Sequence, residues 1–341
     1  MKVLVTGGAG YIGRILIPLL TSGGYDLTII DRNFLSYDDA EKKYNELNCK
    51  FVKDDIRYFD PNILRGMDAV VDLAALSNDP SGEIDPVKTW DINYLGRVRV
   101  ARLAKKLGIK KYILASSCSV YGFREDIASE TSDVNPLTTY AMANRAAEID
   151  NLSLSNGTFT STALRFATAF GYSEKMRLDI AINAMTFYAV KTGKIRLMRD
   201  GNQYRPFVHI KDISNAIATV IESNDESVKG QIFNIGADRL NVKLSDLAGM
   251  VRNSIGIKSE IEMYGDPDNR SYKVSFKKAK EILKFEAITS IEDGIREIDN
   301  KIRSGELTDK EQMHTVNYYK KLMEAETDIQ YRGYNITSRI L

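Results

Sequence analysis

The stretch that most constrains the fold of this chain is its beginning, Met1–Gly13, which reads MKVLVTGGAGYIG. Lys2–Thr6 is a short apolar run rich in β-branched residues, a pattern typical of a buried parallel strand. Gly7, Gly10 and Gly13 then recur every third residue, where the pattern changes to that of a helix. Such glycines allow a tight turn, close approach of the backbone to a pyrophosphate, and close packing of a helix on a strand. The helix would point its N-terminus, the positive end of its dipole, at that phosphate.

An acidic residue closes the next predicted strand. Asp31 ends the run Asp26–Asp31, where a carboxylate can bind both hydroxyls of an adenosine ribose. A glycine triplet alone would equally fit an ordinary turn, but strand, glycines, helix, strand and acid in this order predict a dinucleotide site. Asp31 would repel a 2′-phosphate and favours NAD over NADP, whereas Arg32 could accept that phosphate and leaves the choice open.

Short apolar runs continue along the chain, separated by helical patterns. They lie at Leu27–Ile30, Lys50–Val52, Ala69–Leu73, Tyr112–Ala115 and Thr162–Phe166. Strands that alternate with helices form right-handed βαβ units, so we expect an α/β fold with a Rossmann-type doubly wound parallel sheet covered on both faces. The first helix is expected over Tyr11–Ser22, with a local loss of one hydrogen bond at Pro18.

Charge and the scarcity of ligand-type residues exclude several kinds of function. A net charge of +1 over 341 residues offers no field for nucleic acid or an anionic membrane. The two cysteines, Cys49 and Cys118, and the two histidines, His209 and His314, are too few for a disulfide framework or a zinc site. No apolar stretch is long enough to span a membrane, and the chain begins directly with a strand. We therefore expect a cytoplasmic protein without a metal, in which His209 is a structural hydrogen-bonding residue.

Residues directly after the predicted strands are candidates for ligand contacts, because the carboxyl ends of parallel strands meet at one edge of the sheet. Asp55 could hydrogen-bond an adenine amino group, although a surface turn explains this acid as well. Ala74 and Ala75 are small enough for a flat cofactor to lie against the backbone. The polar loop LSNDPSGEIDP that follows fits a substrate-binding loop and a plain connector equally. A long helix is expected over Trp90–Leu107, with its many Arg and Lys residues on a solvated face.

Several motifs, taken in order, resemble those of the extended short-chain dehydrogenase/reductase family, in its branch of nucleotide-sugar epimerases and dehydratases. They are TGGAGYIG, DLAA at Asp72–Ala75, SSCSVYG at Ser116–Gly122, Tyr140, LRFATAFG at Leu164–Gly171, RPFVHIKDI at Arg205–Ile213 and DNRSY at Asp268–Tyr272. The resemblance covers the chain to about Phe285. Motifs in register are specific for the family but not for one activity.

The resemblance implies a role for each matching residue. Tyr140 would be the acid/base that removes a proton from a sugar hydroxyl as hydride passes to the nicotinamide, and Ser117 would share the hydrogen bond of that hydroxyl. Arg205 and Arg270 would hold the diphosphate of a nucleotide sugar. The residues expected to bind NAD are Gly7, Gly10, Tyr11, Ile12, Gly13, Asp31, Arg32, Asp55, Ile56, Leu73, Ala74, Ala75, Asn93, Ser116, Tyr140 and Asn144. Those expected to bind the substrate are Ser77, Ser117, Ser119, Thr168, Arg177, Arg205 and Arg270.

The sequence departs from the family pattern four residues after Tyr140, where the family has a lysine and this chain has Asn144. That lysine orients the nicotinamide ribose and lowers the pKa of the tyrosine, whereas asparagine carries no charge. An unperturbed tyrosine titrates near ~10, so only about one in a thousand is ionised at neutral pH. Arg145 points about 100° away around the helix and is a poor substitute. We therefore expect slower or pH-shifted chemistry that Asn144→Lys should improve, or else an impaired protein that only binds NAD and nucleotide sugar.

A second departure bears on the reaction. Sugar 4,6-dehydratases of the family carry an acid just after the hydroxyl that corresponds to Ser117, and here Cys118 and Ser119 follow. The pattern looks more like that of a 4-epimerase, which works through a transient 4-keto sugar; a 4-ketoreductase or a dehydratase is the alternative. Cys118 is expected to be a buried packing residue, because nothing basic is placed to ionise it.

Beyond about Gly171 the alternation of strands and helices fades. We expect a Rossmann domain of residues 1–170 with a return segment at about 206–236, and a discontinuous substrate-binding lobe of residues 171–205 and 237–341. Helix starts are expected at Arg177–Asp179, at Ser290 with Asp293 and at Thr308 with Glu311. The last forty or so residues could pack on the lobe or close over the nucleotide. By resemblance, the helices Trp90–Leu107 and Tyr140–Ser155 would form the interface of a homodimer.

Overall fold

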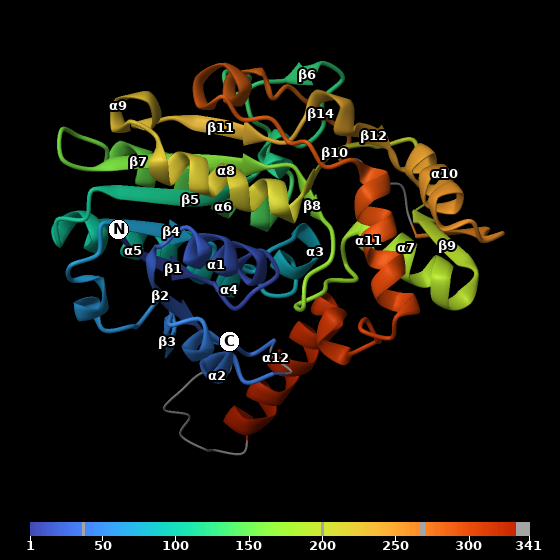
Figure 1. Ribbon diagram of the computed structural model, residues 1–341, viewed down its shortest axis with the longest axis horizontal. Coiled ribbons are helices and arrows are strands. Elements are labelled where there is room, and N and C mark those ends of the chain that lie inside the picture. The colour runs from blue at the N-terminus through green and yellow to red at the C-terminus, as the bar shows by residue number, and fades with distance from the viewer. Residues whose placement is uncertain (36–37, 199–200, 266–269, 332–341) are drawn as a thin grey trace.

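The centre of the molecule is a seven-stranded parallel sheet, shown by a computed structural model that describes residues 1–35, 38–198, 201–265 and 270–331. The strand order is β11-β7-β5-β4-β1-β2-β3 (Figure 1). The strands are β1 (Lys2–Thr6), β2 (Asp26–Asp31), β3 (Lys50–Lys53), β4 (Ala69–Asp72), β5 (Lys111–Ser117), β7 (Thr160–Phe166) and β11 (Ile232–Ile235). This confirms the predicted doubly wound α/β fold. The order changes direction between β1 and β4, which is where such sheets bind ligands.

Helices cover both faces of the sheet. In Figure 1, α1 (Gly13–Ser22) and α8 (Ile210–Glu222) lie in front, while α5 (Arg97–Lys106) and α6 (Thr139–Ser153) lie behind. α1 contacts α8, and α5 contacts α6. The other helices of this part are α2 (Ala40–Glu46), α3 (Asp79–Gly82), α4 (Pro86–Trp90), α9 (Asp225–Val228) and the 3-10 turns η1 (Pro61–Leu64) and η3 (Cys118–Tyr121). The covering helices leave the carboxyl ends of the strands for a ligand.

The segment expected as one helix over Trp90–Leu107 is interrupted. α4 is followed by a π-helical turn, η2 (Asp91–Gly96), and only then by α5. The wider turn brings Asn93 and Arg97 to the interior, where Asn93 is fully buried and Arg97 is 1% exposed. The expectation that all basic residues of this segment form a solvated face was therefore wrong for Arg97. π-Helical turns occur frequently at functional sites.

The C-terminal region carries smaller sheets beside the carboxyl ends of the main strands (Figure 1). One is mixed, in the order β12-β10-β8, and two are strand pairs, β13-β9 and β14-β6. Their strands are β6 (Ile127–Ala128), β8 (Thr168–Phe170), β9 (Lys194–Met198), β10 (Tyr204–His209), β12 (Asn241–Lys243), β13 (Glu260–Tyr264) and β14 (Lys273–Val274). The predicted return to the main sheet is confirmed at β11, whereas β10 pairs within the small mixed sheet.

The helices of this region are α7 (Ala181–Thr192), α10 (Leu244–Ile255), α11 (Ile291–Arg303) and α12 (Thr315–Tyr331), with short turns η4 (Asp238–Leu240), η5 (Ala279–Leu283) and η6 (Glu311–Met313). The expected capping box of Ser290 and Asp293 is confirmed at the start of α11. The helix expected from Thr308 was wrong, because η6 has no side-chain cap and the long helix begins only at Thr315. The helix expected at Arg177–Asp179 begins later, at Ala181. No helix in the described ranges is long and apolar enough to cross a membrane.

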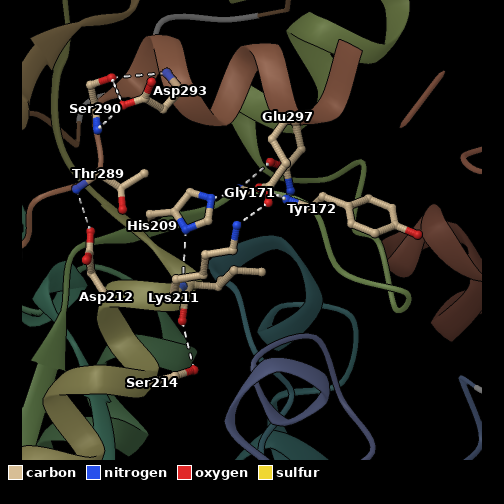
Figure 2. Close-up of polar contacts among 12 residues, drawn as sticks. Gly171, Tyr172, His209, Lys211, Asp212, Ser214, Thr289, Ser290, Asp293 and Glu297 are labelled. Carbon is tan, nitrogen blue, oxygen red and sulfur yellow. Dashed lines mark hydrogen bonds and ion pairs between the residues drawn. The ribbon is translucent and has the colours of Figure 1, made fainter. Parts of the chain in front are cut away.

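His209 joins two helices of the molecule, as Figure 2 shows. Its Nδ1 accepts a hydrogen bond from the backbone N–H of Lys211 (3.1 Å) and caps α8, so that Nε2 can donate to Glu297 of α11 (2.9 Å). Glu297 also accepts bonds from the Lys211 ammonium and from the backbone N–H of Tyr172 (3.1 Å). The predicted structural role of His209 is confirmed, and the network fixes the loop that follows β8.

Candidate active site

A cleft of about 650 Å³ runs along the carboxyl ends of the main strands and into the C-terminal region. The predicted site residues that line it are Gly7, Gly10, Tyr11, Ile12, Gly13, Asp31, Arg32, Asp55, Ile56, Leu73, Ala74, Ala75, Ser77, Ser116, Ser117, Ser119, Tyr140, Thr168, Arg177, Arg205 and Arg270. Two predicted residues, Asn93 and Asn144, lie behind the lining. The sequence motifs therefore meet at one place, although they are spread from residue 7 to residue 270.

The glycine turn lies at the floor of the cleft and has no room for side chains. Gly7 has a φ of +67°, and a Cβ on it would lie 2.7 Å from the backbone nitrogen of Ala74. A Cβ on Gly13 would lie 2.1 Å from the carbonyl oxygen of Gly8, so α1 packs directly on the turn. In the part of the chain that the structure describes, no side chain caps α1. The backbone N–H groups of Arg14, Ile15 and Leu16 donate to the carbonyl oxygens of Gly10 and Ile12. The positive end of the α1 dipole faces the turn and favours an anion such as a pyrophosphate, so the turn fits a dinucleotide.

Carboxylates after β2 and β3 form the neighbouring part of the cleft. Asp31 accepts hydrogen bonds from the backbone N–H groups of Ala9 (2.9 Å) and Asn33 (2.7 Å), which fix its side chain beside the glycine turn. Burial raises the pKa of Asp31, and these two hydrogen bonds act in the opposite direction. Arg32 forms an ion pair with Asp55 (2.9 Å). The arginine that could have accepted a 2′-phosphate is thus held by a carboxylate.

Asn93 supports the cleft from behind. Its amide oxygen accepts from the backbone N–H of Leu76 (2.8 Å), and its amide nitrogen donates to the carbonyl oxygen of the same residue (3.0 Å). Because both ends of the amide bond Leu76, Asn93 holds the loop after β4 in place. The structure thus gives it a positioning contact, where the sequence predicted a contact with the cofactor.

Tyr140 faces the cleft from the first turn of α6, which Thr138 caps. Burial raises the pKa of the Tyr140 phenol above its ordinary value, and the carboxylate of Asp79 adds to this rise. A hydrogen bond with Ser117 and the charges of Arg97 and Arg177 oppose the rise in this pKa without cancelling it. Ser117 is itself fixed at the end of β5, because its hydroxyl accepts from the backbone N–H of Ser119 (3.1 Å). The predicted pair of tyrosine and serine is therefore together in the cleft.

Beside this pair, buried contacts hold the ends of β5 and β7. The Ser116 hydroxyl donates to Glu148 (2.6 Å), which also binds Arg165 through two hydrogen bonds (2.8 and 2.7 Å).

Cys118 is fully buried, as predicted, and burial raises the pKa of its thiol well above the ordinary value. The thiol is not placed to act as a nucleophile.

The arginines gather at the far end of the cleft. Arg205 of β10 donates to the backbone oxygen of Arg270, and Arg270 pairs with the carboxylate of Asp79. Asp268 and Asn269 of the DNRSY motif lie outside the described residues. Arg177 binds Asp179 and donates to the hydroxyl of Ser77 (2.6 Å). Three guanidinium groups therefore line the cleft at positions suited to an anionic ligand.

The lining of the same part of the cleft includes two buried polar atoms. Ser119 Oγ and Gln203 Nε2 are buried in the cleft lining and have no hydrogen-bond partner among the described residues. An unpaired buried polar atom is costly, so these two atoms favour a polar ligand such as a sugar or a base. Sequence reasoning missed Gln203, and only its place two residues before Arg205 could have indicated it.

The C-terminal helix α12 forms one wall of the cleft. Tyr319 packs on Phe34, with ring centroids 5.6 Å apart, and forms a small apolar cluster with Leu76. Thr315 at the start of the helix donates to Asp179 (3.1 Å). Of the two places left open for the C-terminal tail, the structure supports the one beside the nucleotide cleft. Residues 332–341 lie outside the described part of the chain.

Residues 3–236, from β1 through β11, match the NAD dependent epimerase/dehydratase family. The chain belongs to this family. The matched region spans the strands of the main sheet, whereas α12 lies beyond it. Among the described residues, no group of three His, Cys, Asp or Glu side chains could hold a metal.

Relatives within the NAD-dependent epimerase/dehydratase family carry out more than one reaction. A UDP-glucuronate 4-epimerase of Thermodesulfobacterium geofontis is 27% identical over 87% of this chain and 94% of that protein. UDP-glucuronic acid decarboxylase 1 of Xenopus tropicalis is 25% identical over 97% of this chain and 75% of that protein. The solved structure of UDP-glucuronic acid 4-epimerase from Bacillus cereus, in complex with UDP-glucuronic acid and NAD, shares the fold with a TM-score of 0.79, at 23% identity over 89% of this chain and 99% of that one. These similarities leave the particular reaction open.

Proposed function

We propose that this chain is an NAD-dependent epimerase of a nucleoside-diphosphate sugar, which acts through a transient 4-keto sugar. The proposal is carried by one observation: the glycine turn, the Tyr140–Ser117 pair and two arginines line a single cleft. NAD is proposed over NADP because Asp31 lies where a 2′-phosphate would be repelled, and Arg32 is paired with Asp55. NAD, when bound, would take a hydride from the sugar and return it.

The residues of the chain would supply the proton transfer and the positioning. Tyr140 would remove the proton of the sugar hydroxyl as the ketone forms, and would return it as the ketone is reduced. Ser117 would hold that hydroxyl through a second hydrogen bond. Arg205 and Arg270 would bind the diphosphate, and Thr168 would lie near the sugar. Ser119 and Gln203 supply unpaired polar atoms for the remainder of the ligand.

Epimerisation is preferred to dehydration because of the residues after Ser117. Elimination of water needs a further acid or base at the neighbouring carbon. Cys118 is buried away from the cleft, and Ser119 carries a hydroxyl where a dehydratase would have a carboxylate. Hydride return to the opposite face of the ketone needs only rotation of the sugar in the cleft.

The experiment is incubation of the purified protein with NAD and a panel of UDP-, dTDP- and GDP-sugars, with the products identified by NMR. Interconversion of two epimers without net change of NAD supports the proposal. A product that has lost water or CO₂, or net formation of NADH, would replace it by dehydratase, decarboxylase or reductase chemistry. Tight binding without conversion would point to the impaired binding protein.

We also propose the division of the chain given above, with residues 1–170 and 206–236 around NAD and residues 171–205 and 237–341 around the sugar. A homodimer is proposed through the helices behind the sheet. Large apolar side chains are exposed there, namely Val87, Trp90, Leu95, Met142 and Ile149. Exposed apolar groups on neighbouring helices favour a protein interface.

A further inference from the structure

The side chain four residues after Tyr140 points into the protein and meets an arginine from another helix. Asn144 is fully buried. Its amide nitrogen donates to the backbone oxygen of Tyr140 (3.0 Å), and its amide oxygen accepts from Nη1 of Arg97 (2.9 Å). The place where the family pattern has a charged side chain is therefore next to a guanidinium that α5 supplies.

Arg97 joins the elements that carry the cleft. Its Nη2 donates to the backbone oxygens of Asp72, at the end of β4 (3.1 Å), and of Ala115 in β5. Together with the bond to Asn144, these contacts connect the ends of β4 and β5 to α6. Leu73 follows Asp72, Ser116 follows Ala115, and Tyr140 lies one helical turn before Asn144. All three line the cleft, whereas Arg97 does not. A planar guanidinium with several donors suits such a three-way contact.

Arg97 forms a buried ion pair with Asp72, but its hydrogen bonds go to an amide oxygen and to backbone oxygens. The nearest acid is Asp72, whose carboxylate lies 3.7 Å from Nε and is already bound to Thr6 Oγ1 (2.6 Å) and to the Tyr112 hydroxyl. Nε of Arg97 has no hydrogen-bond partner in the described part of the chain. A buried cation of this kind acts on neighbouring groups over a longer distance than one in water.

The other charged groups near Tyr140 form no hydrogen bond with Asn144 among the residues that the structure describes. Asp79, on α3, is an anion and raises the pKa of the phenol. Arg177, on the loop before α7, also lowers the pKa of the phenol, but it lies in the cleft lining and is bound by both carboxylate oxygens of Asp179. Arg145, one residue after Asn144, pairs with Glu148 (3.1 Å).

We propose that Arg97 is the positioning residue that replaces the family lysine, holding Asn144 and supplying from α5 the buried positive charge behind Tyr140. The two tasks of one lysine are then divided between two residues: Asn144 makes the hydrogen bond and Arg97 carries the charge. This inference rests on the proposed role of Tyr140 as acid/base.

The test is the ionisation of Tyr140 itself, measured by NMR on NAD-loaded protein with ¹³Cζ-labelled tyrosine between pH 6 and 11. The resonance is assigned by its loss in Tyr140→Phe. In Arg97→Met the titration midpoint of Tyr140 should rise by about one unit or more, which is at least a tenfold loss of phenolate at a given pH. Arg97→Lys keeps the charge and should move the midpoint by less than half as much.

The matched control is Arg99→Met, two residues along α5. Arg99 also bonds backbone oxygens, those of Ile56 (3.2 Å) and Phe59 (2.9 Å), but it does not contact Asn144. Its removal should leave the Tyr140 midpoint unchanged, even if it lowers the melting temperature as much as Arg97→Met does. An unchanged midpoint in folded Arg97→Met, or a parent protein whose Tyr140 stays protonated to pH 11, would overturn the inference.

If Arg97→Met does not fold, the titration midpoint of Tyr140 is measured in the double variant Arg97→Met/Asn144→Lys instead. It restores one buried cation at the family position. A folded double variant with the parental midpoint supports the relocation of the charge, and a midpoint a unit or more higher contradicts it. A Tyr140→Phe protein with parental turnover would remove the proposed function but leave the titration result standing.

Discussion

The ring of Tyr319 packs against that of Phe34, with 5.6 Å between their centroids, so the C-terminal helix touches the loop that follows β2. Phe34 and Tyr319 both line the cleft on the side of Asp31, where the adenosine of NAD is proposed to bind. We therefore expect α12 to strengthen the binding of the cofactor. Tyr319→Ala should raise the Kd for NAD about tenfold, measured by calorimetry, which corresponds to ~1.4 kcal/mol. Tyr318→Ala, a neighbouring tyrosine outside the cleft lining, is the control; equal affinities in the two variants would count against a role for α12.

Replacement of the Tyr140 hydroxyl tests the acid/base assignment. Tyr140→Phe should lower kcat by roughly 10²–10⁴-fold, because general acid/base catalysis contributes about that much. The substitution keeps the aromatic ring, and the Cβ and backbone of Tyr140 that pack against Gly82 are unchanged. The Kd for NAD and for the nucleotide sugar should therefore stay within about threefold. Turnover is measured on the substrate that the NMR panel identifies. A phenylalanine variant as active as the parent would show that another group moves the proton.

Restoring the family lysine should harm this protein. The sequence alone predicts that Asn144→Lys improves activity, but the structure places the Arg97 guanidinium 2.9 Å from the Asn144 side chain. A lysine would bring two cations together in a fully buried position, which costs several kcal/mol unless one of them loses its proton. Asn144→Lys alone should therefore lower the melting temperature and kcat. Thermal unfolding of the single variant and of Arg97→Met/Asn144→Lys measures this. If the single variant were more stable than the double variant, the expected repulsion between Arg97 and a lysine at position 144 would be wrong.

The exposed side chains of α6 test the proposed dimer. Met142 and Ile149 are seven residues apart, on one face of the helix, and are 43% and 54% exposed. Ile149→Arg should convert a dimer to a monomer in light scattering coupled to size-exclusion chromatography, because a charge would be buried in an apolar contact. Ile288→Arg changes an equally apolar exposed residue away from these helices and should have no effect. A parent protein that is monomeric at micromolar concentration rules the interface out.

The His209–Glu297 contact gives the protein a pH-dependent stability. Burial alone would raise the pKa of Glu297, but its hydrogen bonds from His209, Lys211 and the backbone of Tyr172 outweigh this and lower it from 4.5 to about 2. A depressed pKa stabilises the folded protein above the unfolded value near 4.5 and loses that effect as pH falls towards 2. Glu297→Gln should thus lower the free energy of unfolding by about 1–2 kcal/mol at pH 7, but much less at pH 3. Urea unfolding at both pH values measures the difference, with Glu292→Gln of the same helix as control. A deficit of the same size at both pH values would show that the charge of Glu297 is not the cause.

The parts of the site that the sequence predicted are those that short stretches determine. Gly7 and Gly13 stand in a turn that tolerates no side chain, and Asp31 ends the strand that pairs with β1. Tyr140 and Ser117 both line the cleft, Ser117 at the end of β5 and Tyr140 in the first turn of α6. Local spacing was enough to predict the places of Gly7, Gly13 and Asp31, whereas Tyr140 and Ser117 were predicted from the resemblance of their motifs to the family pattern.

What the sequence did not predict depends on contacts between distant segments. Arg97 lies in the run RVRVARLAKK, where nothing distinguishes it from outward arginines such as Arg102. Its burial follows from the preceding π-helical turn and from partners 18, 25 and 47 residues away. The wall that α12 builds likewise depends on a contact between Tyr319 and Phe34, which no local pattern indicates.

The contact between Arg97 and Asn144 also constrains how such a chain can change over evolutionary time. Exchange of Arg97 alone leaves the site behind Tyr140 without a cation, and a lysine at position 144 alone gives it two. A lineage that moves the charge from one helix to the other must therefore cross an unfavourable intermediate or change both codons together. Searches that recognise members of this family by a tyrosine and the lysine four places on would discard the chain, although a cation is present in the fold. Positions 97 and 144 should be examined as one unit when new sequences are sorted.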